Sequence, residues 1–163
     1  MVRGLKIWRR HSDKSTKLYV LSGYESQGAE EIASIFERIR ILMEYQCLPY
    51  IMRHEYYNRS PYKGMFITLA RWCNQPSFLK KKSFRQFCEA NGLTSSAFRY
   101  MSEFEHDHPD IAKQYFDIRF DRHGAKAPVP FPYVPASEFR PCAAFGGTRP
   151  FPLLHGYGRR KGK

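Results

Sequence analysis

The chain has 163 residues, 42% of them hydrophobic, which suits one domain with a modest core and excludes a chain that is disordered throughout. Its net charge of +12 lies at the two ends, since residues 1–24 contribute +5 and residues 140–163 contribute +6. Basic termini bind polyanions weakly and without sequence choice, so this charge is poor evidence for a dedicated nucleic-acid domain.

The expected cellular compartment is inferred from the absence of membrane-spanning and secretory segments. It has no run of about 18 apolar residues, and its N-terminus lacks the apolar stretch of a secretory signal. We therefore expect a cytoplasmic, reduced protein with no membrane partner. The cysteines contain no CxxC pair, which disfavours both a zinc site and a disulfide framework. They are Cys47, Cys73, Cys88 and Cys142. His106 and His108 are interpreted as a solvated helix end, so no metal site is predicted.

The first elements are a short helix and a strand. Residues 2–11 predict a helix with Leu5 and Trp8 on one face. Residues 17–24 then read Lys-Leu-Tyr-Val-Leu-Ser-Gly-Tyr. The run from Leu18 to Leu21 is apolar without alternation, which is typical of a strand buried on both faces. Gly23 ends this strand.

The clearest helix follows, and a second strand comes directly after it. Ser26 is the expected N-cap, and two glutamates favour the first turn. Apolar residues then recur at spacings of three and four: Ile32, Ile35, Phe36, Ile39, Leu42 and Met43. Residues 48–52 form a second short apolar run. Residues 17–53 therefore predict a βαβ unit, whose parallel strands bind ligands at their C-terminal ends, at residues 22–24 and 52–54.

The rest of the chain predicts helices and an irregular tail. We expect helices over residues 63–73, 84–88, 94–105 and 110–120, the second of them capped by Ser83. From Gly124 onward, seven Pro and six Gly fall in forty residues, which predicts a disordered basic tail. The predicted fold class is α/β, with two parallel strands and several helices in region 1–123 and the tail in region 124–163.

Two stretches resemble a known family. They are "YVLSGY" and, after the long helix, "CLPYIMRHEYYNRSPYKGMFITLARWCNQPSFLKKKSFRQFC". Together they resemble the C-terminal half of radical S-adenosylmethionine (radical SAM) proteins of the bacterial and phage-associated type. The resemblance covers about residues 2–90 and is most specific over "PYIMR…LARWCNQP".

The resemblance implies a full or partial (βα) barrel that binds S-adenosylmethionine and a [4Fe–4S] cluster. It also implies that Arg53, His54 and Asn58, with Ser22 and Gly23 at the other strand end, line the cofactor side. The family holds its cluster with CxxxCxxC, and this sequence has none. We therefore expect a partial or degenerate member without a complete iron–sulfur site, which is an enzyme only if a cluster-binding half is supplied. No catalytic residue is assigned.

A two-stranded parallel sheet has two open edges and offers little area to the long helix. Two arrangements would cover the sheet: the C-terminal helices close over it, or another chain or a second copy supplies further strands. If neither occurs, we expect the protein to be marginally stable.

Residues 53–84 are rich in aromatic and basic side chains, and two further interpretations of them remain open. A non-catalytic binding protein would use them for single-stranded nucleic acid or a protein partner. Its candidate contacts are Tyr56, Tyr57, Arg59, Lys63, Lys80, Lys81 and Lys82. Alternatively the aromatic residues are structural, with Phe66 and Leu69 in the core and Trp72 on a flank beside Arg71.

Overall fold

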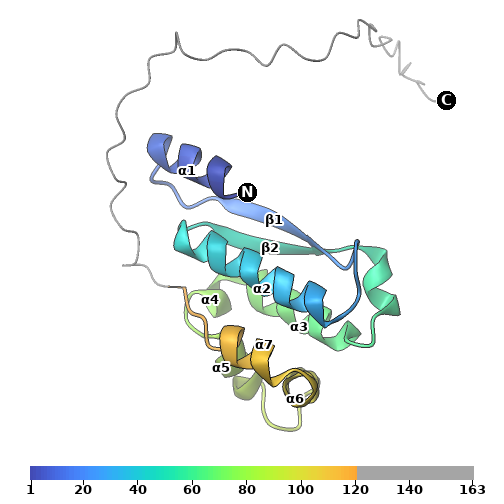
Figure 1. The fold of residues 1–163 in the computed structure, drawn as a ribbon. Coiled ribbons are helices and arrows are strands. Elements are labelled where there is room, and N and C mark those ends of the chain that lie inside the picture. Colours follow the sequence, from blue (N-terminus) through green and yellow to red (C-terminus); the bar gives the residue numbers. More distant parts are fainter. Residues whose placement is uncertain (121–163) are drawn as a thin grey trace, which may run out of the picture. The chain divides into compact units, whose positions relative to one another are not determined.

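The computed structural model describes residues 1–120 and shows a mixed α/β fold (Figure 1). In chain order the elements are α1 (Val2–His11), β1 (Lys17–Ser22), α2 (Ala29–Glu44), β2 (Leu48–Arg53), η1 (Glu55–Arg59), α3 (Lys63–Cys73), α4 (Pro76–Leu79), α5 (Phe84–Ala90), α6 (Ser96–Asp107) and α7 (Pro109–Tyr115). The predicted α/β class and the βαβ unit are confirmed. The predicted tail lies outside the described residues.

The two strands pair in parallel, with Lys17 opposite Leu48 and Ser22 opposite Arg53. One face of this sheet is buried, because Val20 and Ile51 are 4% and 3% exposed. The other face is open: Tyr19 is 70% exposed, and its neighbours on that face, Leu21 and Met52, are about half exposed. The prediction of a β1 buried on both faces was therefore wrong, because among the described residues the helices cover one face only.

Helix α2 buries its predicted apolar stripe against the sheet and the other helices. All six stripe residues are buried: Ile32, Ile35, Phe36, Ile39, Leu42 and Met43. The helix starts at Ala29 with Gly28 as N-cap, so the expected cap at Ser26 was misplaced. Ser26 instead lies in the loop, where its hydroxyl accepts from the Gly28 amide and donates to the carboxylate of Glu30.

Helix α2 and the helices after the sheet form an aromatic core. Phe36 contacts the rings of Trp72, Phe84 and Phe116, with centroids 5.3–6.5 Å away. Trp72 has no exposed surface, and its indole N–H donates to the carbonyl of Lys82 at 3.0 Å. The structural interpretation is confirmed for Phe66, Leu69 and Trp72, which are all fully buried. Placing Trp72 on a flank was wrong, because α5 packs over it.

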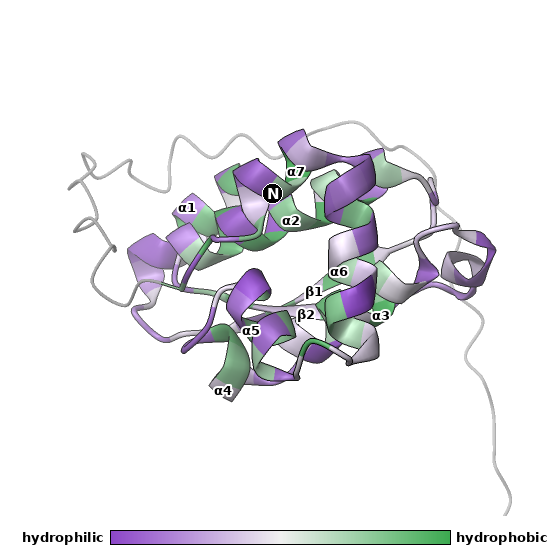
Figure 2. Ribbon diagram, turned by 90° about the horizontal axis from the view of Figure 1, so that it is seen from below, coloured by the Kyte–Doolittle hydropathy of each residue, from purple (hydrophilic) through white to green (hydrophobic). Residues whose placement is uncertain are grey.

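The later helices start close to where the sequence predicted. Ser83 caps α5 through a reciprocal capping box with Gln86. Helix α6 runs about two residues later than predicted, and α7 ends at Tyr115 rather than at residue 120. Figure 2 shows apolar and polar residues mixed along α1, α2 and α6, as expected for half-buried helices. Within residues 1–120, no helix is both long and apolar enough to cross a membrane.

Candidate ligand site at the strand ends

The C-terminal ends of both strands meet at one side of the sheet, next to η1 (Figure 1). The backbone amide of His54 donates to the carbonyl of Ser22 at 2.8 Å. The Ser22 hydroxyl donates to the carbonyl of Met52 at 3.3 Å, and the Ser22 side chain is fully buried. The structure thus places Ser22 beneath the site, where it joins the two strands. Its predicted role in direct cofactor contact stays a prediction.

Gly23 allows the two loops to approach closely. Its φ of +73° lies in the left-handed region, and a Cβ there would stand 2.8 Å from the Cβ of Tyr57. Its amide donates to Glu31 of α2 at 3.3 Å, and Glu31 pairs with Arg38 at 3.0 Å. Both the conformation and the hydrogen bond fix where the chain leaves β1.

Three rings and one cation gather above this junction, and we call them the strand-end cluster: Tyr24, His54, Tyr56 and Arg59. The His54 ring is nearly perpendicular to both tyrosine rings, with centroids 4.9 Å from Tyr24 and 4.4 Å from Tyr56. The two tyrosine rings are parallel to within 6°, at 6.4 Å. The guanidinium of Arg59 lies 4.5 Å from the centre of the Tyr56 ring.

Local backbone structure orients this cluster. His54 is the N-cap of η1, and its ring Nδ1 accepts from the amide of Tyr56. That hydrogen bond fixes the imidazole relative to Tyr56. Tyr24 is 55% exposed and Arg59 is exposed, so the cluster has surface available to a ligand. Flat rings next to a guanidinium suit a planar ligand that carries negative charge.

The remaining predicted residues divide between this site and other places. Arg53 is exposed, and its guanidinium lies 4.8 Å from the centre of the Tyr57 ring, beside the cluster. Asn58 is exposed on η1, where its amide donates to the carbonyl of Glu55. Lys63 is exposed at the start of α3. These three therefore border the same side of the molecule.

The lysines at 80–82 lie elsewhere. They follow α4, beyond the far end of α3, whose eleven residues span roughly 16 Å. Figure 1 shows α4 at the opposite end of the sheet from η1. One ligand contact that joins Lys80, Lys81 and Lys82 to the tyrosines of η1 would need to extend along all of α3. Lys80, Lys81 and Lys82 were predicted to act together with the tyrosines of η1 because the sequence does not show in which direction α3 runs.

The described cysteines do not suit an iron–sulfur cluster. Cys47, Cys73 and Cys88 are all buried, and they lie on three different segments. Burial raises the pKa of the Cys73 thiol and raises that of Cys88 to about 12, so both are protonated at neutral pH. Among residues 1–120, no group of three or more His, Cys, Asp or Glu could hold a metal ion. These residues do not fit a [4Fe–4S] cluster.

Sequence reasoning assigned residues around Tyr24 but not Tyr24 itself. The available signal was its position, because it lies two residues beyond the end of β1. Its contact with Tyr56 crosses 32 positions in the sequence, and only the parallel register of the strands brings the two rings together. Comparisons of the chain with protein-family models, curated proteins and solved structures found no match.

Proposed function

We propose that this chain is a partial radical SAM-type protein, which recognises an adenine-containing ligand at the strand-end cluster and lacks a complete iron–sulfur site of its own. The observation that carries the proposal is the set of rings and guanidinium groups at the C-terminal ends of two parallel strands. S-Adenosylmethionine has a flat purine and a carboxylate, which match these groups chemically.

In this proposal, Tyr24, His54 and Tyr56 hold the purine, and Arg53 and Arg59 hold the carboxylate. A bound S-adenosylmethionine would supply a sulfonium-activated carbon. The chain's own contribution is to bind and orient, with η1 fixing the imidazole and Gly23 fixing the first loop. No reaction step is assigned, because the described cysteines do not fit the cluster that the family uses.

The second candidate is a non-catalytic protein that binds single-stranded nucleic acid at the same cluster. The parallel rings of Tyr24 and Tyr56, with Arg59 stacked on one of them, are the observation that favours it. Stacking on aromatic rings contributes about 1–3 kcal/mol per base. Lys63, exposed at the start of α3, would add a phosphate contact.

Isothermal titration calorimetry of the full chain separates these candidates. The probes are S-adenosylmethionine, S-adenosylhomocysteine and an eight-nucleotide oligothymidylate. Our proposal expects both nucleosides to bind, with affinity falling at least tenfold in Tyr56→Ala. Tyr50→Ala is the matched control, because Tyr50 also carries a cation, Lys17 at 5.2 Å, but lies on the open sheet face. Binding of the oligonucleotide alone would support the second candidate. Binding of no probe would exclude both.

A further inference from the structure

The two outer edges of the sheet differ in whether their hydrogen-bonding groups are satisfied. In β2, the residues whose backbone faces away from β1 are Pro49, Ile51 and Arg53. Pro49 has no N–H. The Ile51 amide donates to Asn74 Oδ1 at 2.7 Å, and its carbonyl accepts from Asn74 Nδ2 at 3.1 Å. The side chain of Asn74 therefore stands where a neighbouring strand would pair, and this edge is closed.

The outer edge of β1 is open. The hydrogen bonds from Leu48 to Thr16 and from His54 to Ser22 show that the even-numbered residues of β1 face β2, so Lys17, Tyr19 and Leu21 face outward. The Leu21 carbonyl accepts from Arg38 at 2.7 Å. Within residues 1–120, the N–H and C=O of Tyr19 have no hydrogen-bond partner, and the strand carries neither proline nor bulge. Natural proteins usually protect such an edge.

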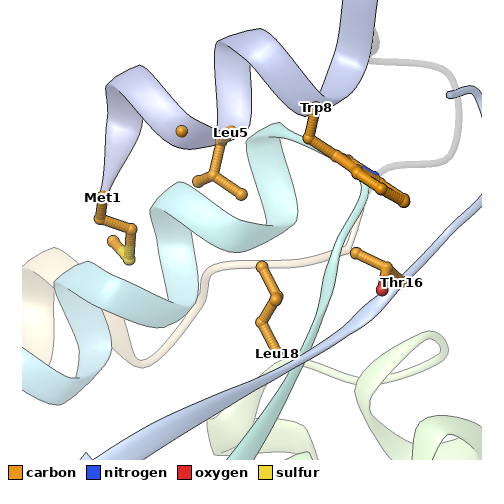
Figure 3. Close-up of a pocket in the computed structure, with 6 residues that line it drawn as sticks. Met1, Leu5, Trp8, Thr16 and Leu18 are labelled. Atoms are coloured by element: carbon orange, nitrogen blue, oxygen red, sulfur yellow. The ribbon is translucent and has the colours of Figure 1, made fainter. Parts of the chain in front are cut away.

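An apolar groove runs beside this open edge. One side is lined by Met1, which precedes α1, and by Gly4, Leu5 and Trp8 of α1, and the other side by Thr16 and Leu18 (Figure 3). Leu5 is buried, but Met1 and Trp8 remain 60% and 42% exposed. A strand added beside β1 would place alternate side chains in this groove. Its other side chains would extend the exposed row that Tyr19 and Leu21 begin.

The positive charge around the groove and the β1 edge indicates which kind of segment could bind there. Arg3 and Lys6 are exposed on α1, Lys17 is exposed on β1, and residues 1–24 together carry +5. A second copy would bring the same +5 against this surface, and residues 140–163 of the chain carry +6. Both would be repelled, whereas an acidic segment would be attracted.

We propose that the open edge of β1 and the α1 groove dock an extended segment of a different protein, which adds as a third strand, places apolar side chains in the groove and carries acidic side chains that the basic residues of α1 and β1 attract. This mode of recognition is β-augmentation. The docking proposal is supported by the open edge of β1, the apolar groove and the positive charge around them. It does not depend on the ligand proposed at the strand ends.

The test uses a fluorescein-labelled ten-residue peptide that alternates valine with glutamate and threonine, and a twin in which lysine replaces glutamate. Fluorescence anisotropy with the full chain should show the acidic peptide binding at least tenfold more tightly. Arg3→Glu with Lys6→Glu should reverse this preference without disturbing the fold, since both side chains are exposed. Lys113→Glu, at an exposed lysine of α7, is the matched control and should change nothing.

Two further measurements locate the contact. Tyr19→Pro removes an outward-facing N–H and should abolish peptide binding, whereas Tyr19→Thr keeps the N–H and should preserve it. Amide exchange at Tyr19 and Leu21 should slow when the acidic peptide binds. Equal binding of the two peptides, or no binding up to about 1 mM, would overturn the proposal. So would sedimentation showing that the chain self-associates and that the peptide competes with this association, because the occupant would then be a second copy.

Discussion

In the helical part of the molecule, the aromatic rings of α2, α3, α5 and α7 pack against one another with almost no exposed surface, whereas in the sheet, one face and one edge stay open. Phe36 and Tyr19 illustrate the difference, since the first is fully buried and the second is 70% exposed. Both are large aromatic residues in regular secondary structure. Their environments differ because, within residues 1–120, the sheet has two strands and helices cover one side of it.

This contrast indicates which part holds the fold together and which part is available for binding. Stability should depend on the helical core, because burial of apolar area is the main favourable term in folding. Recognition should depend on the sheet, at its strand ends and at the β1 edge. Substitutions in the helical core should therefore cost more stability than substitutions on the open face of the sheet.

Replacing Phe36 with alanine should give the largest loss of stability, about 3–5 kcal/mol, because it leaves a cavity among Trp72, Phe84 and Phe116. Denaturant unfolding followed by circular dichroism measures the change. Tyr19→Ala is the control and should cost less than about 1 kcal/mol, because Tyr19 is 70% exposed and its ring packs edge-on against Tyr50. Equal losses at the two positions would contradict the proposed division.

Asn74→Ala should destabilise the protein by about 1–3 kcal/mol, because the amide of the buried Ile51 loses its partner. Amide exchange at Ile51 should accelerate, and the exchange rate is the more specific measurement. Gln75→Ala, at the exposed neighbouring residue, should alter neither. Unchanged exchange at Ile51 would show that Asn74 does not close that edge.

Gly23→Ala should cost about 1–3 kcal/mol, because alanine is strained at a φ of +73° and its Cβ would meet Tyr57. Gly92→Ala is a matched control, since Gly92 also has a positive φ, of 94°, but has open space around it. The difference between the two losses isolates the contact with Tyr57. If the two variants lose the same stability, the close approach of the loops is not important.

Glu105→Gln should cost about 1 kcal/mol at pH 7, because it weakens two 2.8 Å hydrogen bonds from Arg85 to the Glu105 carboxylate. Arg85 lowers the pKa of Glu105 in the folded state. The stabilisation is therefore present above the carboxyl's ordinary pKa and is lost as the pH falls through the lowered value. The stability difference from wild type should vanish in acid, and Glu103→Gln, in an exposed pair, should show little difference at any pH. A difference that stays constant with pH would contradict this account.

Much of the fold could be predicted from periodicity. The stripe of α2 and the limits of α3 follow from apolar spacing, and the βαβ order follows from two short apolar runs on either side of a helix. The buried state of Trp72 could not be predicted, because it depends on how the chain turns after α3 so that Phe84, twelve residues later, packs against it. The open face of β1 was missed for a related reason: the composition of a strand does not show how many helices cover it.

The candidate site was predicted only in part. Position after a strand drew attention to residues 22–24 and 52–54, and the structure brings these two segments together through the hydrogen bond from His54 to Ser22. The direction of α3 separates Lys80–Lys82 from η1, and no local pattern encodes that separation. The contact between Tyr24 and Tyr56 depends on strand register, which sequence spacing alone does not give.

The hydrogen bonds of Asn74 to Ile51 have a consequence for assembly. A sheet that is free at both sides can recruit copy after copy and grow into a filament. Here the side chain of Asn74 closes the β2 edge, so a further strand can pair directly only with β1. Any growth beyond that strand depends on the free edge of the added strand itself. A complex built on this sheet should therefore have a fixed, small stoichiometry, and raising the concentration of the chain should not produce polymers through β2.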